Sequence, residues 1–166
     1  MEYWDIFKDG KLIGVKRKDE PLEEGQYHRY VDAWMEVEED LFLIQRRSLR
    51  KHLYPGWWSC SVSGAVHAGE RPLEGVLREI KEELSLHVEP KNVVLYQKIR
   101  EGQGLFYIYY IYQELGDQKI RLQEEEVMEV DMVSRERIFS LVEEKKLVKL
   151  DYYPSFFRWV DSLKGR

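Results

Sequence analysis

The sequence predicts an α/β fold in which helices cover a mixed β-sheet. Three observations lead to this prediction: short apolar runs of strand length recur along the chain, few segments show helical spacing, and those few are interleaved with the strands. With 166 residues, 43% of them hydrophobic, the chain is long enough for one well-buried core and short for two. We therefore expect residues 1–166 to form a single domain.

Charge and cysteine content exclude several classes of protein. The formal net charge of −5 gives no reason to expect a general binder of nucleic-acid polymers or membranes. A single cysteine excludes an internal disulfide and suits a reducing compartment. No basic segment followed by an apolar run opens the chain, and no stretch approaches the roughly 20 apolar residues of a membrane span. We expect a cytoplasmic protein with a small-molecule partner.

The first half of the chain is predicted to form a hairpin and then strands. Residues 3–16 predict a β-hairpin around the Asp9-Gly10 turn, and a polar connection follows as far as residue 25. The next expected strands cover residues 27–37, 41–47 and 57–66. The last of them should deliver Gly64 to a helix.

Strands and helices alternate in the second half. The expected strands cover residues 93–100, 105–112 and 127–133, and the middle one is apolar or aromatic on both faces, which predicts an interior place in the sheet. Ser134 is a suitable N-cap for a helix with Ile138, Leu141 and Val142 facing inward. Pro154 should open a last helix whose apolar residues at helical spacing are Phe156, Phe157, Val160 and Leu163.

The helix expected over residues 72–84 carries two distinct faces. Pro72 suits its first position, and one apolar stripe consists of Leu73, Val76, Leu77, Ile80 and Leu84. Glu79, Glu82 and Glu83 also recur at spacings of three and four, on a face beside the stripe at the edge of the core. Such carboxylates repel one another unless a divalent cation, which prefers oxygen ligands, lies between them. The alternative is a solvated acidic face of the kind common on surface helices.

The spacing of the surrounding residues resembles the signature of the Nudix hydrolases. Gly64 is followed after five residues by Glu70, and after seven more by the run from Arg78 to Leu86, REIKEELSL. Every fixed position of the family pattern matches except Ser85, where the family has glycine. That glycine ends the helix in a left-handed conformation, so we expect serine there to cost about 1 to 2 kcal/mol or to move the helix end slightly.

The resemblance implies a fold, a metal and a reaction. The fold is the Nudix fold, an α/β/α sandwich around a mixed β-sheet, with residues 64–86 as the Nudix box after the N-terminal β-hairpin. Glu79, Glu82 and Glu83 would hold Mg²⁺, or alternatively Mn²⁺, with Glu70 as a further ligand or supporting acceptor. A metal-activated water then cleaves a P–O–P linkage, with Glu82 and Glu83 at the catalytic centre.

The same resemblance assigns roles to three neighbours of these glutamates. Arg78 is expected to orient a carboxylate through a bidentate hydrogen bond. Gly64 and Ala65, at the start of the box, are expected to contact the substrate.

Residues 26–133 also resemble the isopentenyl-diphosphate isomerase branch of the superfamily. The segment RRSLRKHLYPGWW is similar to the arginine-rich loop and W-P-G-x-W turn of that enzyme. Arg47 and Lys51 fall where the isomerase contacts diphosphate, His28 falls on a metal-binding histidine, and Glu124 and Glu126 fall on metal-binding glutamates. Glu126 is our candidate for an extra ligand or the general base. Each of these assignments has an alternative. Arg47 and Lys51 can belong to a basic loop that only aids solubility. His28 can be a hydrogen-bonded strand histidine, and Glu124 and Glu126 can belong to a solvated acidic turn.

The isomerase chemistry does not carry over at two positions. Ser63 and Ala65 stand where the isomerase has its catalytic cysteine and a metal-binding histidine. Cys60 comes three residues before Ser63, which on one continuous strand places it on the opposite face. We therefore favour hydrolysis of a nucleoside diphosphate derivative or a related organic diphosphate. The alternatives are a prenyl-diphosphate isomerase or hydrolase, and a non-catalytic module that binds a nucleotide or a protein.

Two further expectations concern aromatic residues. Trp57 and Trp58 alternate faces on their strand, so one can be core while the other stacks on a base or lines a pocket, although both can be core. The N-terminal hairpin and the aromatic strands could also form the surface of a homodimer.

Overall fold

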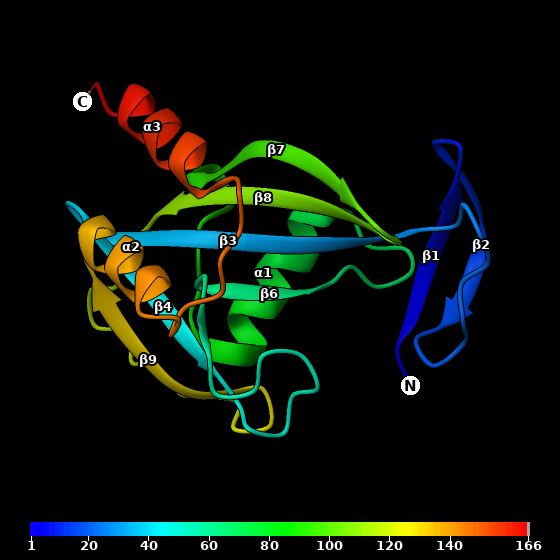
Figure 1. The fold of residues 1–166 in the computed structure, drawn as a ribbon, viewed down its shortest axis with the longest axis horizontal. Helices are drawn as coiled ribbons and strands as arrows, with labels where there is room; N and C mark the ends of the chain where they lie inside the picture. The colour runs from blue at the N-terminus through cyan, green and yellow to red at the C-terminus, as the bar shows by residue number, and fades with distance from the viewer. Residues whose placement is uncertain (166) are drawn as a thin grey trace.

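Strand β3 (His28–Glu38) is the longest strand of the computed structural model, which describes residues 1–165, and the main sheet is built around it (Figure 1). This seven-stranded sheet has the order β5-β4-β3-β8-β7, with β6 also paired to β3 and β9 to β4. β3 and β8 are parallel, whereas β3 is antiparallel to β4 and β6. The other strands are β4 (Leu41–Arg47), β5 (Trp58–Ser59), β6 (Val62–Ala65), β7 (Val93–Glu101), β8 (Gly104–Tyr112) and β9 (Val127–Val133).

Helices cover both faces of this sheet, as predicted. α1 (Pro72–Leu84) packs on one face, and α2 (Arg135–Glu143) and α3 (Tyr153–Leu163) pack on the other (Figure 1). The 3₁₀ turn η1 (Pro90–Asn92) precedes β7. None of the helices within residues 1–165 has the length and apolar character that a membrane span requires.

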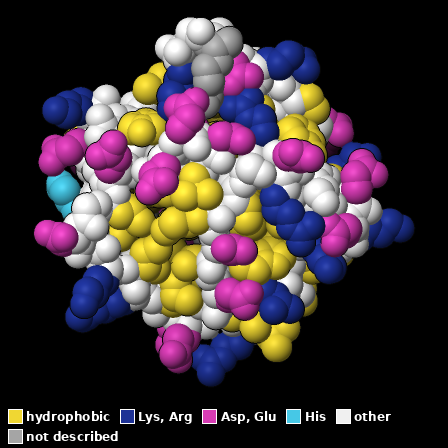
Figure 2. All heavy atoms as spheres, turned by 90° about the vertical axis from the view of Figure 1, so that its left-hand side faces the viewer, with side chains coloured by type: hydrophobic (Ala, Val, Ile, Leu, Met, Phe, Trp, Pro, Cys, Tyr) yellow, Lys and Arg dark blue, Asp and Glu magenta, His cyan; other side chains and the backbone are white. Residues whose placement is uncertain are grey.

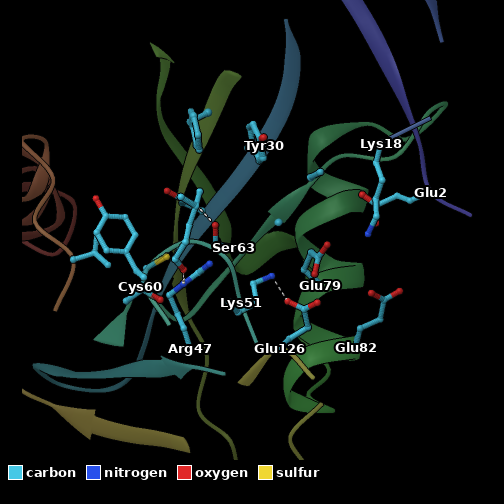
Figure 3. Close-up of a pocket in the computed structure, with 18 of the residues that line it drawn as sticks. Glu2, Lys18, Tyr30, Arg47, Lys51, Cys60, Ser63, Glu79, Glu82 and Glu126 are labelled. Atoms are coloured by element: carbon cyan, nitrogen blue, oxygen red, sulfur yellow. Dashed lines mark hydrogen bonds and ion pairs between the residues drawn. The ribbon is translucent and has the colours of Figure 1, made fainter. Parts of the chain in front are cut away.

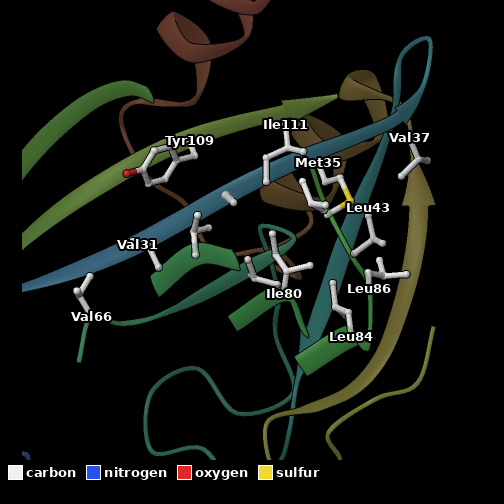
Figure 4. Close-up of a cluster of buried hydrophobic side chains, with 14 residues drawn as sticks. Val31, Met35, Val37, Leu43, Val66, Ile80, Leu84, Leu86, Tyr109 and Ile111 are labelled. Atoms are coloured by element: carbon white, nitrogen blue, oxygen red, sulfur yellow. The ribbon is translucent and has the colours of Figure 1, made fainter. Parts of the chain in front are cut away.

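Alternating side chains of β3 supply both hydrophobic cores. Val31 and Met35 point toward α1 and join the buried cluster shown in Figure 4, together with Ile80 and Leu84 of the helix. Trp34 points the other way and is buried against the aromatic side chains of α3. Because period-two alternation sends successive side chains to opposite faces, one strand anchors both layers.

The N-terminal hairpin is confirmed and forms a sheet of its own. β1 (Tyr3–Lys8) pairs with β2 (Lys11–Arg17), and Asp9 and Gly10 both have positive φ, 51° and 76°, as a tight hairpin turn requires. Phe7 exchanges two backbone hydrogen bonds with Tyr27 just before β3. Isolated two-stranded hairpins are marginal in water, so these contacts hold the hairpin in place.

At the opposite end of the sheet, hydrophobic side chains gather on the surface among acidic and basic ones (Figure 2). Among the partly buried residues there are Leu41 and Met132, which pack against the hydrophobic core between α1 and the sheet. This end of the molecule lies far from the hairpin (Figure 1).

The prediction of one continuous strand over residues 57–66 is wrong, because the chain changes its partner strand within this segment. β5 pairs with β4 (Gln45 opposite Ser59), whereas β6 pairs with β3 (Asp32 opposite Ser63). Buried Ser61 lies at the fork, where its hydroxyl accepts from the Met35 N–H at 2.8 Å and donates to the carbonyl oxygen of Leu43. The bend removes the strict alternation of faces between residues 60 and 63.

The helix ends match the sequence prediction, but one residue predicted to lie on an apolar helix face is exposed. α1 has the predicted bounds, and Ser134 caps α2 by accepting from the Arg137 N–H at 3.1 Å. In α3, however, Leu163 is 47% exposed rather than buried, because it lies in the last turn, beyond the edge of the core that Val160 reaches.

Ser85 keeps the left-handed helix end that the family builds with glycine. Its φ and ψ are 59° and 32°, its N–H donates to the Lys81 carbonyl oxygen at 3.0 Å, and its Oγ donates to the Arg121 carbonyl oxygen at 3.1 Å. The helix therefore ends where it would with glycine, and the hydroxyl compensates in part for the strain.

We expect Ser85→Ala to lower the free energy of unfolding by about 1 kcal/mol, since the strain stays and the hydrogen bond is lost. Ser85→Gly should be more stable than Ser85→Ala by about 1 kcal/mol, because glycine adopts the left-handed region without strain. Urea unfolding with unchanged m values measures both. Equal stabilities of the two variants would contradict this account of the helix end.

Candidate active site

At Gly64 a side chain of α1 lies directly against the sheet. A Cβ placed on it would lie 2.3 Å from Oε1 of Glu79, so any side chain here would displace that carboxylate. The glycine on β6 thus lets the Glu79 carboxylate rest directly against the strand backbone. This packing brings the acidic face of the helix to the edge of β6.

Arg78 joins the three parts of the Nudix box. Its guanidinium binds Glu70 in bidentate fashion, with Nε to Oε2 at 2.7 Å and Nη2 to Oε1 at 3.1 Å. Nη1 donates to Glu79 at 3.0 Å and to Glu82 at 3.1 Å, and Nη2 donates to the Ala65 carbonyl oxygen at 3.0 Å. The planar fork of arginine suits such a set of acceptors, which lysine could not satisfy together.

Glu70 braces the loop between β6 and α1. Besides Arg78, its carboxylate accepts a hydrogen bond from the His67 N–H at 2.8 Å. Burial by itself would raise the pKa of Glu70, but the hydrogen bonds from Arg78 and His67 outweigh it and the pKa is lowered. Glu70 is therefore a fixed anion that holds Arg78 in place.

Two other carboxylates of the box, those of Glu79 and Glu83, lack sufficient compensating charge. Burial raises the pKa of Glu79 to about 7 although Arg78 opposes the shift. Glu83 is 3% exposed, and burial, together with the charges of Glu79 and Glu126, raises its pKa well above the usual value. Its nearest donor is the amide of Gln45, at 3.5 Å. Buried acids of this kind take up protons or bind cations.

The oxygen donors of this helix face fit a hard divalent cation such as Mg²⁺. Within residues 1–165 no three His, Cys, Asp or Glu side chains are already gathered closely enough to hold a metal ion. Glu79 and Glu82 instead share Arg78, so each would exchange part of that contact for the metal.

A cavity of about 720 Å³ opens beside this helix face (Figure 3). Glu79 and Glu82 line one wall, together with Arg78, Gly64 and Ala65. Another wall carries side chains from β4 and the loops, namely the charged Arg47, Lys51 and Glu126 and the neutral Gln123. The Lys51 ammonium forms an ion pair with Glu126, so two segments far apart in the sequence meet here.

Five predicted site residues do not line this cavity. Glu70 is bound to Arg78, and Glu83 is buried beside the amide of Gln45. Glu124 is exposed in the turn before β9, and Trp58 packs against the second hydrophobic core. His28 is 3% exposed and stacks on Trp4 with ring centroids 3.8 Å apart. Burial lowers the pKa of His28 to about 4, against the negative charge of Glu2. Its surroundings are those of a packed core histidine.

Cys60 does reach the cavity, contrary to the prediction of the opposite face. The bend at Ser61 turns it so that both Cys60 and Ser63 line the cavity. The Cys60 thiol donates to the Val62 carbonyl oxygen at 3.2 Å, and burial raises its pKa well above the usual value. The side chain is therefore a neutral thiol rather than a thiolate.

Several cavity residues were missed by the sequence reasoning. Asp32 on β3 lines the cavity at 6% exposure, and the hairpin contributes Glu2, Trp4, Lys18 and Asp19. A lone aspartate inside the apolar run YVDAWMEV was an available signal, because buried charges need a reason. No comparable signal marked the hairpin residues.

Comparisons with known proteins agree with this fold and identify the family. The NUDIX domain family model matches residues 26–156. An uncharacterized Nudix hydrolase of Listeria innocua is 28% identical over 143 residues, covering 85% of each chain. A prenyl-diphosphate phosphatase of Methanosarcina mazei is 28% identical over 62% of this chain and 60% of its own, and isopentenyl-diphosphate isomerases match over shorter stretches.

A solved structure from Deinococcus radiodurans shares the fold. It superposes with a TM-score of 0.76 at 21% identity, covering 95% of this chain and 98% of its own. The chain belongs to the Nudix hydrolase family, and it is an enzyme of the pyrophosphohydrolase class. Divalent metal ions are the general cofactors of that family.

We expect Arg78→Lys to lower the free energy of unfolding by about 1 to 3 kcal/mol in EDTA, because several charge-assisted hydrogen bonds to half-buried carboxylates are lost. Arg71→Lys on the same helix is the matched control. Arg71 pairs with Glu74 in solvent, at 76% and 50% side-chain exposure, so its loss should be below about 0.5 kcal/mol. Similar small losses for both variants in urea unfolding would contradict a central role for Arg78.

Asp32 should make stability fall as pH rises. Burial raises its pKa to about 6, from an ordinary 3.8, against the Ser63 hydrogen bond and the charge of Arg47. The folded protein then binds the proton more tightly than the unfolded chain, so its stability decreases between about pH 4 and pH 6. Relative to Asp32→Asn in EDTA, wild type should lose up to about 3 kcal/mol from pH 4 to pH 7. A pH-independent difference between the two proteins would contradict this.

Proposed function

We propose that this enzyme uses Mg²⁺ to hydrolyse the P–O–P linkage of an organic diphosphate, with nucleoside diphosphate derivatives as the leading substrate class. One observation carries the proposal: acidic side chains of α1 and the cations Arg47 and Lys51 line the same cavity. A substrate diphosphate can then be held by the basic wall while metal bound to the acidic wall contacts its oxygens.

Each glutamate has a role that follows from its surroundings. Glu79, Glu82 and Glu83 are the proposed ligands of Mg²⁺, which Mn²⁺ could replace, and Glu70 supports them through Arg78. The bound cation would neutralise charge on the phosphates and lower the pKa of a water molecule. Arg78 keeps its bidentate contact with Glu70 and so holds the ligand face in register with β6.

The ion pair between Lys51 and Glu126 suggests how the substrate engages the basic wall. When Lys51 turns to a substrate phosphate, it releases the Glu126 carboxylate. Glu126 is then free to accept a proton from the attacking water or to serve as an extra ligand. Arg47 lines the same cavity and supplies a second cation for the diphosphate. Since the hairpin also lines the cavity, we propose that residues 1–166 act as one functional unit.

A prenyl diphosphate is the second candidate substrate. The similarity to a prenyl-diphosphate phosphatase supports it, and so does the apolar wall of the cavity formed by Leu53, Val148 and Leu150. Isomerisation would in addition need an acid beside the alkene. The neutral Cys60 thiol is in the cavity, but the isomerase's catalytic position is occupied by Ser63.

The proposal predicts metal-dependent turnover that fails in Glu83→Gln. Nucleotide sugars, dinucleotides, nucleoside triphosphates and prenyl diphosphates are incubated with and without Mg²⁺ or Mn²⁺, and released phosphate or nucleoside monophosphate is measured. We expect Glu83→Gln to lower kcat by about 100-fold or more, because a buried metal ligand is lost.

Glu136→Gln, an equal charge change on the exposed start of α2, is the matched control and should retain full turnover. Turnover that needs no metal, or full activity of Glu83→Gln, would refute the proposed mechanism. Formation of dimethylallyl diphosphate from isopentenyl diphosphate would favour the isomerase alternative.

A further inference from the structure

Three neighbouring strands place a polar pair and an aromatic pair on one wall of the cavity. Asp32 on β3 lies opposite Ser63 on β6, and the Ser63 hydroxyl donates to the Asp32 carboxyl at 2.6 Å. Tyr30, two residues earlier on the same face of β3, stacks on Phe106 of β8 with ring centroids 4.6 Å apart and planes 9° apart. Figure 3 shows Ser63 and Tyr30 facing the cavity. The proposed hydrolysis uses none of these side chains.

Asp32 has acceptor capacity that the described residues leave unused. A carboxylate offers about four lone-pair sites, and Ser63 is the donor that the protein provides within residues 1–165. Asp32 nevertheless lies at 6% exposure on the cavity wall. Buried polar groups are normally hydrogen-bonded, so a carboxyl on the wall of a ligand cavity points to a ligand that donates hydrogen bonds.

The position of Arg47 connects this wall to the diphosphate. Its positive charge lies near enough to lower the pKa of Asp32, and it also lines the cavity beside Lys51. An organic group attached to a diphosphate held by Arg47 and Lys51 would therefore extend over Asp32. Beyond Asp32 it would meet the half-buried rings of Tyr30 and Phe106, whose faces suit a planar group.

We propose that Asp32, oriented by Ser63, is the specificity-determining residue that selects a nucleoside over a hydrocarbon as the organic group of the substrate. Ribose hydroxyls and base amino groups donate hydrogen bonds to it, and the Tyr30–Phe106 pair packs against the base. This inference rests on the proposed diphosphate hydrolysis and names the substrate class within it.

A prenyl chain has no hydrogen-bond donor to offer Asp32. It would cover Asp32 with hydrocarbon and exclude water from a carboxyl that has one protein partner among the described residues. Sites built around a hydrogen-bonding group discriminate strongly against analogues that lack the complementary group, because the buried polar atom is then left unpaired. The apolar residues Val148 and Leu150 lie on the same cavity but cannot offset this loss next to Asp32.

The test compares Asp32→Leu, Asp32→Asn and wild type on two kinds of substrate. One is the best wild-type substrate among ADP-ribose, GDP-mannose, UDP-glucose and CDP-choline, and the other is geranyl diphosphate, all with Mg²⁺. We expect the ratio of kcat/KM values, nucleoside over prenyl, to fall at least tenfold in Asp32→Leu. Asp32→Asn keeps an acceptor for Ser63 and should fall between Asp32→Leu and wild type.

Asp131→Asn is the matched control. Asp131 is an exposed aspartate of β9 whose side chain accepts a hydrogen bond from the adjacent Met132 N–H at 2.8 Å, so its substitution removes the same charge away from the cavity. Its substrate ratio should equal that of wild type. Far-ultraviolet circular dichroism and urea unfolding verify that each variant is folded, and Asp32→Asn, being isosteric, serves if Asp32→Leu does not fold.

Calorimetric binding of the same nucleotides and of geranyl diphosphate in EDTA separates this inference from the hydrolysis itself. Nucleotide binding that is lost in Asp32→Leu supports the role of Asp32 even if no variant turns anything over, in which case the hydrolysis proposal alone fails. An unchanged substrate ratio, an equal loss for both substrates, tighter wild-type binding of geranyl diphosphate, or no binding of either ligand would overturn the inference. Turnover that persists in those cases leaves the hydrolysis standing.

Discussion

Arg78 donates hydrogen bonds to Glu70, Glu79 and Glu82 and to the Ala65 carbonyl oxygen, and in doing so joins a loop, a helix face and a strand edge. The same acidic residues would repel one another without a cation among them. A single delocalised charge therefore holds the Nudix box together before any metal binds. Because Glu70 takes two of these hydrogen bonds and has a lowered pKa, Arg78 would stay anchored if Glu79 and Glu82 turned to a metal.

The cavity depends on how the sheet divides beside β3. β4 pairs with the last part of β3 and β6 with the first part, and Ser61 bonds to both β3 and β4 at the fork. The division lets the basic end of β4 diverge from β6, so that Arg47 and Glu79 line opposite parts of one space. Positioning of the two charged walls is thus a property of strand pairing rather than of any loop alone.

Local patterns predicted most of the fold, because their causes are local. Alternation and helical spacing located nearly every element, and the spacing of the box located the acidic helix with its bounds. The exceptions depend on tertiary structure. No pattern in residues 57–66 indicates that the chain changes its partner strand at Ser61. The predicted face of Cys60 was wrong for that reason. Asp32 was missed because its role depends on its contact with Ser63 of another strand and on the cavity, neither of which a local sequence pattern describes.

The N-terminal hairpin and its flanking residues contribute to the wall of the cavity, although the hairpin's own sheet is separate from the main one. Glu2 pairs with His67, and the Ala68 N–H donates to the Tyr3 carbonyl oxygen, so the N-terminal segment also contacts the loop that leads into α1. Mutations in these first residues can therefore change both the lining of the cavity and the loop before α1. For the experimenter, an affinity tag belongs at the C-terminus, because an extension before Met1 would begin next to Glu2, which lines the cavity.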